Sequence, residues 1–298
     1  MSILSIITPT FNRAPLLSRC FESLLCQTCF DFEWIVVDDG STDDTVEVVA
    51  SFHPNFEFKY IQKSNGGKHT ALNAAHPFVH GEYVLILDSD DCLINTAVQE
   101  VLEAWGQYKQ NQNVGIVTFL KGQDKEHPVC TVEDFNTPVE IMRYQRHIIS
   151  SSDCCEVIRA DLFLQYPFPE YENERFIAEC ALWNRISFNY KAIYINSVIY
   201  ICEYLDGGLT RSGRALRINN PKGGMFISNL RMDKSNYFKQ RIKYSVMYTC
   251  YARFSKVPMS AMLGNARSPV LALVCAPAGE ILYRYWKKKY GNNIDSVR

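Results

Sequence analysis

Short hydrophobic runs separated by longer polar segments dominate the first 120 residues. The runs span residues 4–8, 34–37, 56–61, 83–87 and 114–120. They are rich in β-branched and aromatic side chains, and the segments between them are long enough to hold helices. The pattern predicts strand–helix–strand units, and therefore an α/β fold with a mostly parallel, Rossmann-like sheet flanked by helices.

Several segments carry helix signals. Pro15 favours a helix that opens at residue 14, because proline suits the first helical turn. Ser41-Thr42-Asp43-Asp44 has the composition of a capping box ahead of a helix over 46–52. Periodicity is too weak over 124–150 to assign elements there. The pattern further predicts helices over 94–108, 178–188 and 237–254 and a strand over 192–201.

Charge is divided unevenly along the chain. Residues 1–230 contain 18 Lys and Arg against 29 Asp and Glu, whereas residues 231–298 contain 13 against 3. We therefore expect an acidic body, residues 1–210, followed by a basic and helical C-terminal extension, residues 211–298. An acidic body would repel phosphates, so the sequence disfavours a nucleic-acid-binding protein.

Composition and cysteine use point to a folded cytoplasmic protein. The residues are 47% hydrophobic and 21% charged, which excludes a disordered chain. Eleven cysteines without regular spacing indicate reduced thiols, and no targeting segment is visible. The longest apolar run, residues 270–276, ends at Pro277 and is too short to span a bilayer.

Polar residues follow three of the predicted strands. They are Thr8 to Arg13, Asp38 to Ser41, and Asp88 to Asp91. Ligands in open α/β sheets lie at the carboxyl ends of the strands, so we expect these three turns to meet at one edge of the sheet.

Asp88-Ser89-Asp90 is a D-x-D sequence directly after a hydrophobic run. Two close carboxylates repel each other unless a cation neutralises them, and their hard oxygen atoms suit Mg²⁺ or Mn²⁺. Such an ion could neutralise a departing diphosphate. The alternative is that Asp90 and Asp91 merely cap the next helix.

Two further segments have both a functional and a structural interpretation. Asp39 could hydrogen-bond a base, or simply favour the positive end of the following helix. The segment from Asn65 to Thr70 fails the Walker pattern, yet its Lys68 at a helix start could meet a phosphate.

Glu179 lies in an otherwise apolar stretch, residues 176–183. Burial raises the pKa of a carboxyl group toward the range of a general base, so Glu179 is a candidate for that role. The alternative is a structural ion pair with Arg185 or Arg175.

Four motifs follow one another along the chain: Thr-Pro-Thr-Phe-Asn-Arg, Val-Val-Asp-Asp-Gly-Ser, Asn-Gly-Gly-Lys-His-Thr and Leu-Asp-Ser-Asp-Asp. Their order resembles that of the family 2 glycosyltransferases, which have the GT-A fold. The resemblance is strong over 3–120 and weaker through Glu179-x-x-Leu182-x-x-Arg185. It implies an inverting transfer of a sugar from a nucleotide-sugar, usually a UDP-sugar. It also divides the body into a donor half, 1–120, and an acceptor half, 121–210.

The resemblance assigns roles residue by residue. Glu179 would be the general base that deprotonates the acceptor hydroxyl, and Asp90, helped by Asp88, would hold Mn²⁺ or Mg²⁺. The donor-binding residues would be Thr8, Pro9, Phe11, Arg13, Asp39, Lys68 and Asp88. Apart from the resemblance, the glycine-rich residues 207–211 predict a mobile loop able to close over the donor, in which Arg211 could bind the diphosphate. The alternative is that Arg211 is a solvated loop arginine.

The sequence also departs from the family pattern. Ala178 and Cys180 flank Glu179 where two adjacent acids are usual, so Glu174 is the reserve candidate for the base. The Gln-x-x-Arg-Trp signature of processive synthases is absent, which predicts one sugar per encounter.

The C-terminal extension combines Tyr283, Tyr285, Trp286 and Tyr290 with Lys287, Lys288 and Lys289. Aromatics beside lysines suit the anionic inner face of a cell membrane, where the enzyme would meet a lipid-linked or glycan acceptor. Packing on the body or on a partner is the alternative, and the sequence leaves a homo-oligomer open.

Two other functions remain as alternatives. A sugar nucleotidyltransferase is disfavoured because residues 8–13 lack the glycine-rich, basic loop that would hold a triphosphate. A non-catalytic nucleotide-sugar-binding scaffold would not need Asp88, Asp90 and Glu179.

Overall fold

The computed structural model describes residues 2–132, 136–140, 154–202 and 209–290, apart from the side chains of 209–212. Within this part the chain forms two compact units. The first contains residues 1–167 and 189–203, and the second contains residues 168–188 and 204–298. The predicted domain boundary at residue 210 stays a prediction.

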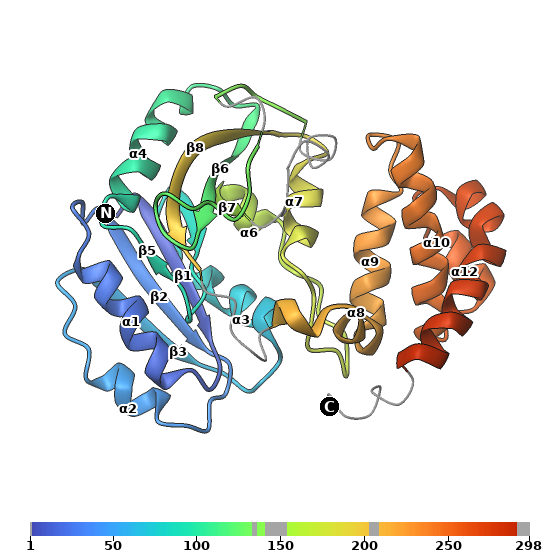
Figure 1. The fold of residues 1–298 in the computed structure, drawn as a ribbon, viewed down its shortest axis with the longest axis horizontal. Coiled ribbons are helices and arrows are strands. Elements are labelled where there is room, and N and C mark those ends of the chain that lie inside the picture. Colours follow the sequence, from blue (N-terminus) through green and yellow to red (C-terminus); the bar gives the residue numbers. More distant parts are fainter. Residues whose placement is uncertain (1, 133–135, 141–153, 203–208, 291–298) are drawn as a thin grey trace. The chain divides into compact units, whose positions relative to one another are not determined.

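An eight-stranded sheet forms the centre of the first unit, in the order β3-β2-β1-β4-β7-β6-β8-β5 (Figure 1). Strands β1, β2, β3 and β4 run parallel, β7 is antiparallel to β4 and β6, β8 is parallel to β6, and β5 is antiparallel to β8. The strands are β1 Leu4–Thr10, β2 Phe32–Asp38, β3 Glu57–Gln62, β4 Tyr83–Ile86, β5 Cys92–Leu93, β6 Val114–Gly122, β7 Cys154–Arg159 and β8 Lys191–Ile201.

Helices cover both faces of the sheet because β1, β2 and β4 are apolar on both sides. Leu4, Ile6, Trp34 and Leu85 belong to a core shared with α1 and α4, whereas α3 and α6 pack on neighbouring strands. The helices of this unit are α1 Ala14–Leu25, α2 Thr45–Ala50, α3 Lys68–Ala75, the 3-10 turn η1 His76–Phe78, α4 Ala97–Tyr108 and α6 Ala160–Gln165.

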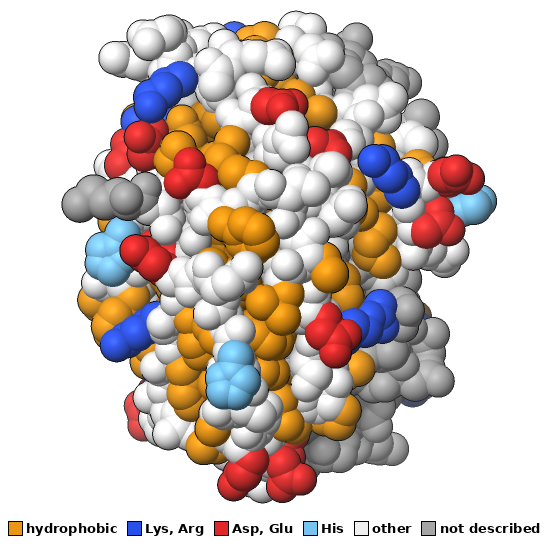
Figure 2. Space-filling view, turned by 90° about the vertical axis from the view of Figure 1, so that its left-hand side faces the viewer, with side chains coloured by type: hydrophobic (Ala, Val, Ile, Leu, Met, Phe, Trp, Pro, Cys, Tyr) orange, Lys and Arg blue, Asp and Glu red, His pale blue; other side chains and the backbone are white. Residues whose placement is uncertain are grey.

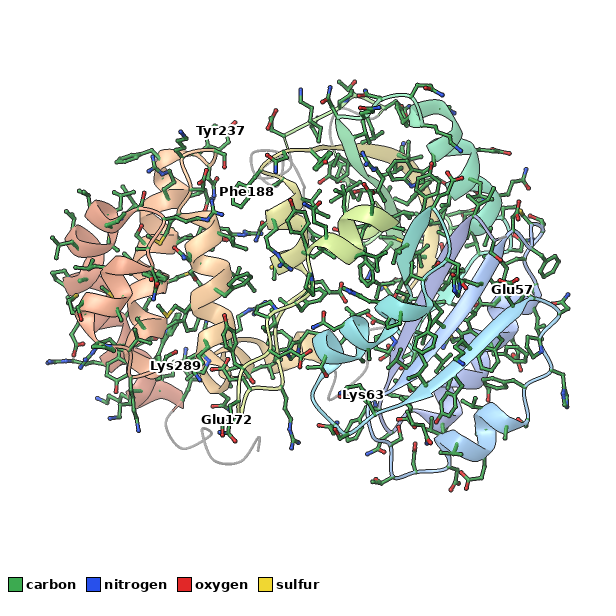
Figure 3. All side chains as sticks on the ribbon, turned by 180° about the vertical axis from the view of Figure 1, so that it is seen from behind. Glu57, Lys63, Glu172, Phe188, Tyr237 and Lys289 are labelled. Carbon is green, nitrogen blue, oxygen red and sulfur yellow. The ribbon has the colours of Figure 1, made fainter. Side chains whose placement is uncertain are left out.

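The second unit is helical. Its elements are α7 Cys180–Ile186, α8 Leu209–Asn219, α9 Pro221–Arg231, α10 Phe238–Phe254, α11 Met259–Gly264 and α12 Pro269–Tyr290. Helix α10 packs against both α9 and α12, and Tyr237 and Lys289 lie at opposite ends of this unit (Figure 3). In the described part of the chain, no helix is both long and apolar enough to cross a bilayer.

Most predicted elements are present, but two predictions about them were wrong and one strand was not predicted. The capping box is absent, because Asp44 precedes α2 without capping it and Asp43 instead accepts hydrogen bonds from Thr45. Residues 209–211 begin α8 and are not a loop. Helix α12 runs through Pro277 and joins the apolar run 270–276 to the aromatic and basic residues that follow it. Strand β7 was not predicted at all.

The face of the first unit shown in Figure 2 carries acidic and basic side chains interspersed among hydrophobic ones. No field of one sign gathers on this face.

Candidate functional site

Strands β2, β1 and β4 are parallel neighbours, so their carboxyl ends meet at one edge of the sheet. The amide of Asp39 donates to the carbonyl of Thr10 at 2.8 Å. Beyond the strands, the amide of Thr42 donates to Asn12 Oδ1 at 2.8 Å, and the amide of Asn12 donates to Ser41 Oγ at 2.9 Å. The structure thus brings the first two predicted turns into direct contact.

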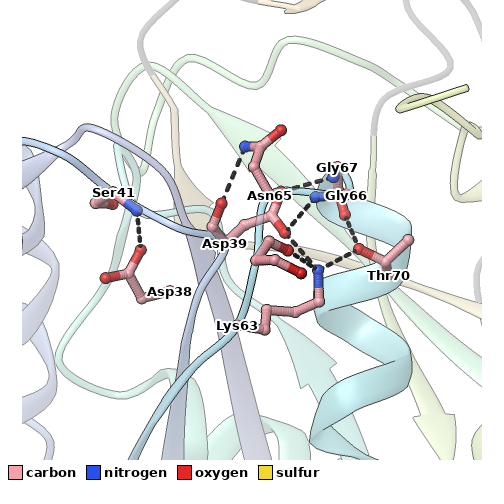
Figure 4. A network of polar contacts seen from close by, with 9 residues as sticks. Asp38, Asp39, Ser41, Lys63, Asn65, Gly66, Gly67 and Thr70 are labelled. Carbon is pink, nitrogen blue, oxygen red and sulfur yellow. Dashed lines mark hydrogen bonds and ion pairs between the residues drawn. The ribbon is translucent and has the colours of Figure 1, made fainter. Parts of the chain in front are cut away.

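Asp39 is buried and organises the glycine-rich segment (Figure 4). Its Oδ1 accepts hydrogen bonds from Lys63 Nζ at 2.7 Å and from the Gly66 amide at 2.9 Å. Its Oδ2 accepts one from the Gly67 amide at 2.6 Å, and its carbonyl accepts one from Asn65 Nδ2 at 2.9 Å. The carboxylate therefore holds the turn that leads into α3.

Gly67 completes this turn with a φ of +93°, which L side chains rarely adopt. Helix α3 begins at the next residue, Lys68, as the sequence predicts. Lys63 also donates to Thr70 Oγ1 at 2.8 Å, so one ammonium group ties the end of β3 to the first turn of α3. Lys63 was not predicted from the sequence.

The predicted donor-binding residues of the β1 edge have different environments. Thr8 is buried, and its hydroxyl accepts a hydrogen bond from Trp34 Nε1 at 2.9 Å. Pro9 is buried within β1. Phe11 is 45% exposed, and Arg13 is half-buried at the start of α1. Phe11 is the one aromatic residue of the four, and its ring is accessible.

Lys68 forms an ion pair with Asp88, which follows β4. Burial works against ionisation of Asp88, but the positive charges of Lys68 and Lys121 outweigh it and hold the pKa of Asp88 below its usual value. The structure thus joins the glycine-rich segment to the D-x-D sequence, two motifs that the sequence analysis treated separately.

A buried layer that the sequence analysis missed supports the D-x-D turn. The Asp88 amide donates to the hydroxyl of Tyr200 at 2.9 Å, and Tyr200 donates in turn to the Asp91 carboxylate. Lys121 Nζ lies 4.2 Å from the centre of the Tyr200 ring. Burial, followed by repulsion from Asp88, raises the pKa of Asp91 to about 7.

Asp90 differs from its two acidic neighbours. It is half-buried, and within the described residues its carboxylate makes no hydrogen bond or ion pair. The same part of the chain contains no group of three or more His, Cys, Asp and Glu side chains arranged around a metal. Two carboxylates without a full protein cage match the way Mg²⁺ is held, by one or two carboxylates plus substrate phosphates.

Glu174 and Glu179 belong to the second unit. Glu174 is buried, and its carboxylate accepts hydrogen bonds from the amides of Lys222 and Gly223 at 2.8 and 2.9 Å. It therefore occupies the N-terminus of α9, where a negative charge is favoured. Burial raises its pKa, in opposition to these two hydrogen bonds.

Glu179 lies at the start of α7 and is half-buried. Its carbonyl accepts a hydrogen bond from the amide of Leu182 at 2.8 Å, while its side chain does not cap the helix. Arg185, one of the two proposed ion-pair partners, lies with its guanidinium 5.7 Å from the centre of the Phe226 ring. The side chain of Arg211 and residues 207–208 lie outside the described part of the chain.

Comparison of the sequence with known proteins gives a family and several relatives. The model of the family described as glycosyl transferase family 2 matches residues 5–166. Chondroitin synthase of Pasteurella multocida is 38% identical over 120 residues, which are 38% of this chain and 12% of that protein. A PGL/p-HBAD biosynthesis glycosyltransferase of Mycobacterium bovis is 40% identical over 91 residues, 30% of this chain and 36% of that one. The chain thus matches only part of the length of these relatives.

Comparison of the structure adds the fold. Residues 1–349 of S. aureus TarS in complex with UDP-GlcNAc superpose with a TM-score of 0.63 at 18% identity, covering 98% of this chain and 92% of that one. A mannosyltransferase from Pyrobaculum calidifontis, with GDP-Man and Mn²⁺, gives 0.55 at 18% identity, with coverage of 96% and 83%. The expected GT-A fold is confirmed. Since the family model covers more than half of the 298 residues, the chain belongs to glycosyl transferase family 2.

Proposed function

We propose that the chain is an inverting, metal-dependent glycosyltransferase. It transfers one sugar from a UDP-sugar to a hydroxyl group of a glycan or lipid-linked acceptor, in the synthesis of a surface polysaccharide. The observation that carries the proposal is the end of β4. There Lys68 pairs with Asp88, while Asp90 has no hydrogen bond or ion pair within the described residues.

The donor would bind at the edge formed by β1, β2 and β4. Phe11 presents an exposed ring on which a base can stack. Lys68 would share its charge between Asp88 and the diphosphate, and Arg13 and Arg211 would add positive charge. Asp39 already accepts hydrogen bonds at both carboxylate oxygens from Lys63 and the glycine-rich turn. A hydrogen bond between Asp39 and the base would be additional to these.

Asp90, with help from Asp88, would hold Mn²⁺ or Mg²⁺. A bound divalent ion supplies Lewis-acid stabilisation of the charge on the departing diphosphate. The chain's own residues set the conditions for this. Lys68 and Lys121 keep Asp88 ionised, and Tyr200 fixes the backbone of the turn through the Asp88 amide.

Glu179 would act as the general base. It takes the proton of the acceptor hydroxyl while that oxygen forms a bond to the anomeric carbon. The bond from that carbon to the nucleoside diphosphate breaks on the opposite face, which inverts the configuration. Glu174, the reserve candidate, is committed to the amides of α9, which favours Glu179.

The relatives support the classes of donor and acceptor. The solved structures of similar fold contain UDP-GlcNAc and GDP-Man, and the relatives include chondroitin and hyaluronan synthases. We therefore propose a nucleotide-sugar donor, a glycan acceptor and a cytoplasmic site of action at the inner face of the membrane.

A thermal-shift panel tests the donor proposal. The protein is heated with UDP-sugars, GDP-sugars and their diphosphates, each with Mn²⁺ and with EDTA. A ligand that binds only the folded state raises the melting temperature by mass action. We expect a metal-dependent rise with one UDP-sugar. A rise that is the same in EDTA would contradict metal dependence, and no rise with any nucleotide would contradict the donor site and favour a scaffold.

A further inference from the structure

Helix α12 is apolar on two opposite faces, of which the first packs inside the second unit. Ala272, Cys275, Gly279 and Trp286 are buried. A methyl group at Gly279 would overlap the hydroxyl of Thr249 in α10, and the Trp286 ring lies 5.7 Å from that of Tyr251. These contacts fix which side of α12 faces α10.

The opposite face carries a line of exposed hydrophobic side chains, here called the α12 stripe: Val270, Val274, Ile281 and Tyr285. Their exposed fractions are 75%, 70%, 71% and 56%. At 100° per residue their spacings of four, seven and four place all four within about 60° of arc on the helix. Pro277 and Ala278 are also exposed and fall in the same line. The stripe extends over about 22 Å, at 1.5 Å per residue.

Such a stripe is unusual on a water-exposed helix. An ordinary surface helix is apolar on the side that faces the core and polar on the other. Single exposed hydrophobic residues need no explanation, but a continuous line of them marks an interaction site. Something apolar is therefore expected to cover this face.

The charges beside the stripe indicate what covers it. Arg284, Lys287, Lys288 and Lys289 are exposed over its last two turns. Residues 231–290 contain twelve Lys and Arg and only two acids, Asp233 and Glu280. Asp233 pairs with Arg267, and Glu280 pairs with Arg253 and Arg284. The surface around the stripe is therefore positive and complements an anionic partner.

A second copy of the chain fits these charges poorly. Across a symmetric interface through the stripe, it would present the same positive surface. A phospholipid leaflet with anionic headgroups offers both an apolar interior for the aliphatic side chains and negative charge for the lysines.

We propose that the α12 stripe docks the C-terminal unit on an anionic phospholipid surface. Val270, Val274 and Ile281 enter the boundary between headgroups and acyl chains, Tyr285 lies at the headgroup level, and Lys288 and Lys289 contact anionic headgroups. Two of the aromatics first expected to do this are otherwise engaged, since Trp286 is buried and Tyr283 packs against Phe254, whereas Tyr285 is exposed. The aliphatic residues of the stripe take their place.

Sedimentation with vesicles tests the proposal without nucleotide or acceptor, so its outcome is independent of the proposed transfer reaction. The full chain is spun with vesicles of phosphatidylcholine alone and with equimolar phosphatidylcholine and phosphatidylglycerol. We expect binding to the anionic vesicles only, and weaker binding as salt is added. Equal binding to both vesicles, or to neither, would overturn the proposal.

Matched variants identify the surface. The double variant Lys288→Gln with Lys289→Gln should lower partitioning roughly 30-fold, at about 1 kcal/mol for each cation. Val274→Ser with Ile281→Ser should lower it by about tenfold or more. Two control variants, Lys109→Gln with Lys125→Gln and Val46→Ser, make similar changes at exposed positions of the first unit and should leave partitioning unchanged.

Every substituted side chain is exposed, so the variants should keep the wild-type melting temperature. A control that lowered partitioning as much as the α12 variants would overturn the assignment of the surface. Light scattering on the same samples measures the oligomeric state and so tests the alternative that a second copy of the chain covers the stripe. If Val274→Ser with Ile281→Ser converted a dimer into a monomer, and wild-type protein did not bind vesicles, the stripe would be an interface between copies and the proposal would be wrong.

Discussion

The three acidic residues proposed for the donor site, Asp39, Asp88 and Asp90, differ in their partners. Asp39 is held by Lys63 and two backbone amides, and Asp88 is held by Lys68. Asp90 has no such contact among the described residues. Because an ionised carboxylate that is partly removed from water needs a partner, Asp90 is the group best prepared for an added cation.

At the residue scale, Glu179→Gln is the direct test of the proposed base. The amide keeps the shape of the side chain but cannot take a proton, so transfer should fall by about 10²–10⁴-fold. Affinity for the donor should not change, because the variant leaves the first unit intact. Steady-state transfer rates and donor titrations of the same preparation measure both quantities.

The matched control for this experiment is Glu172→Gln. Glu172 is exposed in the same unit, so its loss removes an equal charge without touching α7. It should transfer at the wild-type rate. Near wild-type transfer by Glu179→Gln would assign Glu179 a structural role and remove it from the mechanism.

Site residues could be predicted from the sequence where they belong to a short motif or lie next to a predicted strand or helix. Asp88, Asp90 and Lys68 follow predicted strands or open predicted helices. Tyr200 lies 112 residues from Asp88, whose amide it binds, and nothing local in residues 192–201 indicates that contact. Lys121 was missed for the same reason.

At the element scale, the start of α3 depends on a backbone that only glycine adopts easily. Gly67→Ala should lower the free energy of unfolding by about 1–3 kcal/mol, because φ is +93° and ψ is 158° at that position. The same change should weaken donor binding, since it displaces the amides that hold Asp39. Chemical denaturation and donor titration measure the two effects.

Gly106→Ala provides the contrast. Gly106 lies within α4, and a methyl group there would meet nothing within 4 Å. Alanine should therefore stabilise the protein by about 0.5–1 kcal/mol. If both variants changed stability in the same direction, the special role of the turn before α3 would be contradicted.

Hydrophobic runs predicted the parallel half of the sheet because β1, β2 and β4 are buried on both faces. Strand β7 was missed because it begins at Cys154, just beyond the stretch of weak periodicity. The bounds of α12 were not predicted, because proline usually ends a helix, whereas α12 continues past Pro277 and packs against α10. Tertiary contacts thus decided both elements.

At the scale of the whole molecule, the uneven charge along the chain agrees with two proposed functions, donor binding and membrane docking. The acidic first part contains the carboxylates proposed to work with a cation, and the basic last part contains the stripe proposed to meet a leaflet. Sequence composition already separated these two parts. It could not show that the hydrophobic residues of α12 are aligned on its exposed face, because that depends on which face packs against α10.

The central claim is that Asp90 provides a metal-dependent site for the donor, and calorimetric titration of UDP tests it most directly. Wild-type protein, Asp90→Asn and the control Asp31→Asn, exposed at the other end of β2, are each titrated with Mn²⁺ and with EDTA. We predict that wild type and control bind only with Mn²⁺. Asp90→Asn should bind at least about tenfold more weakly, since a contact to a charged group is worth roughly 1.5–3 kcal/mol. Unchanged, metal-dependent affinity in Asp90→Asn would contradict the account.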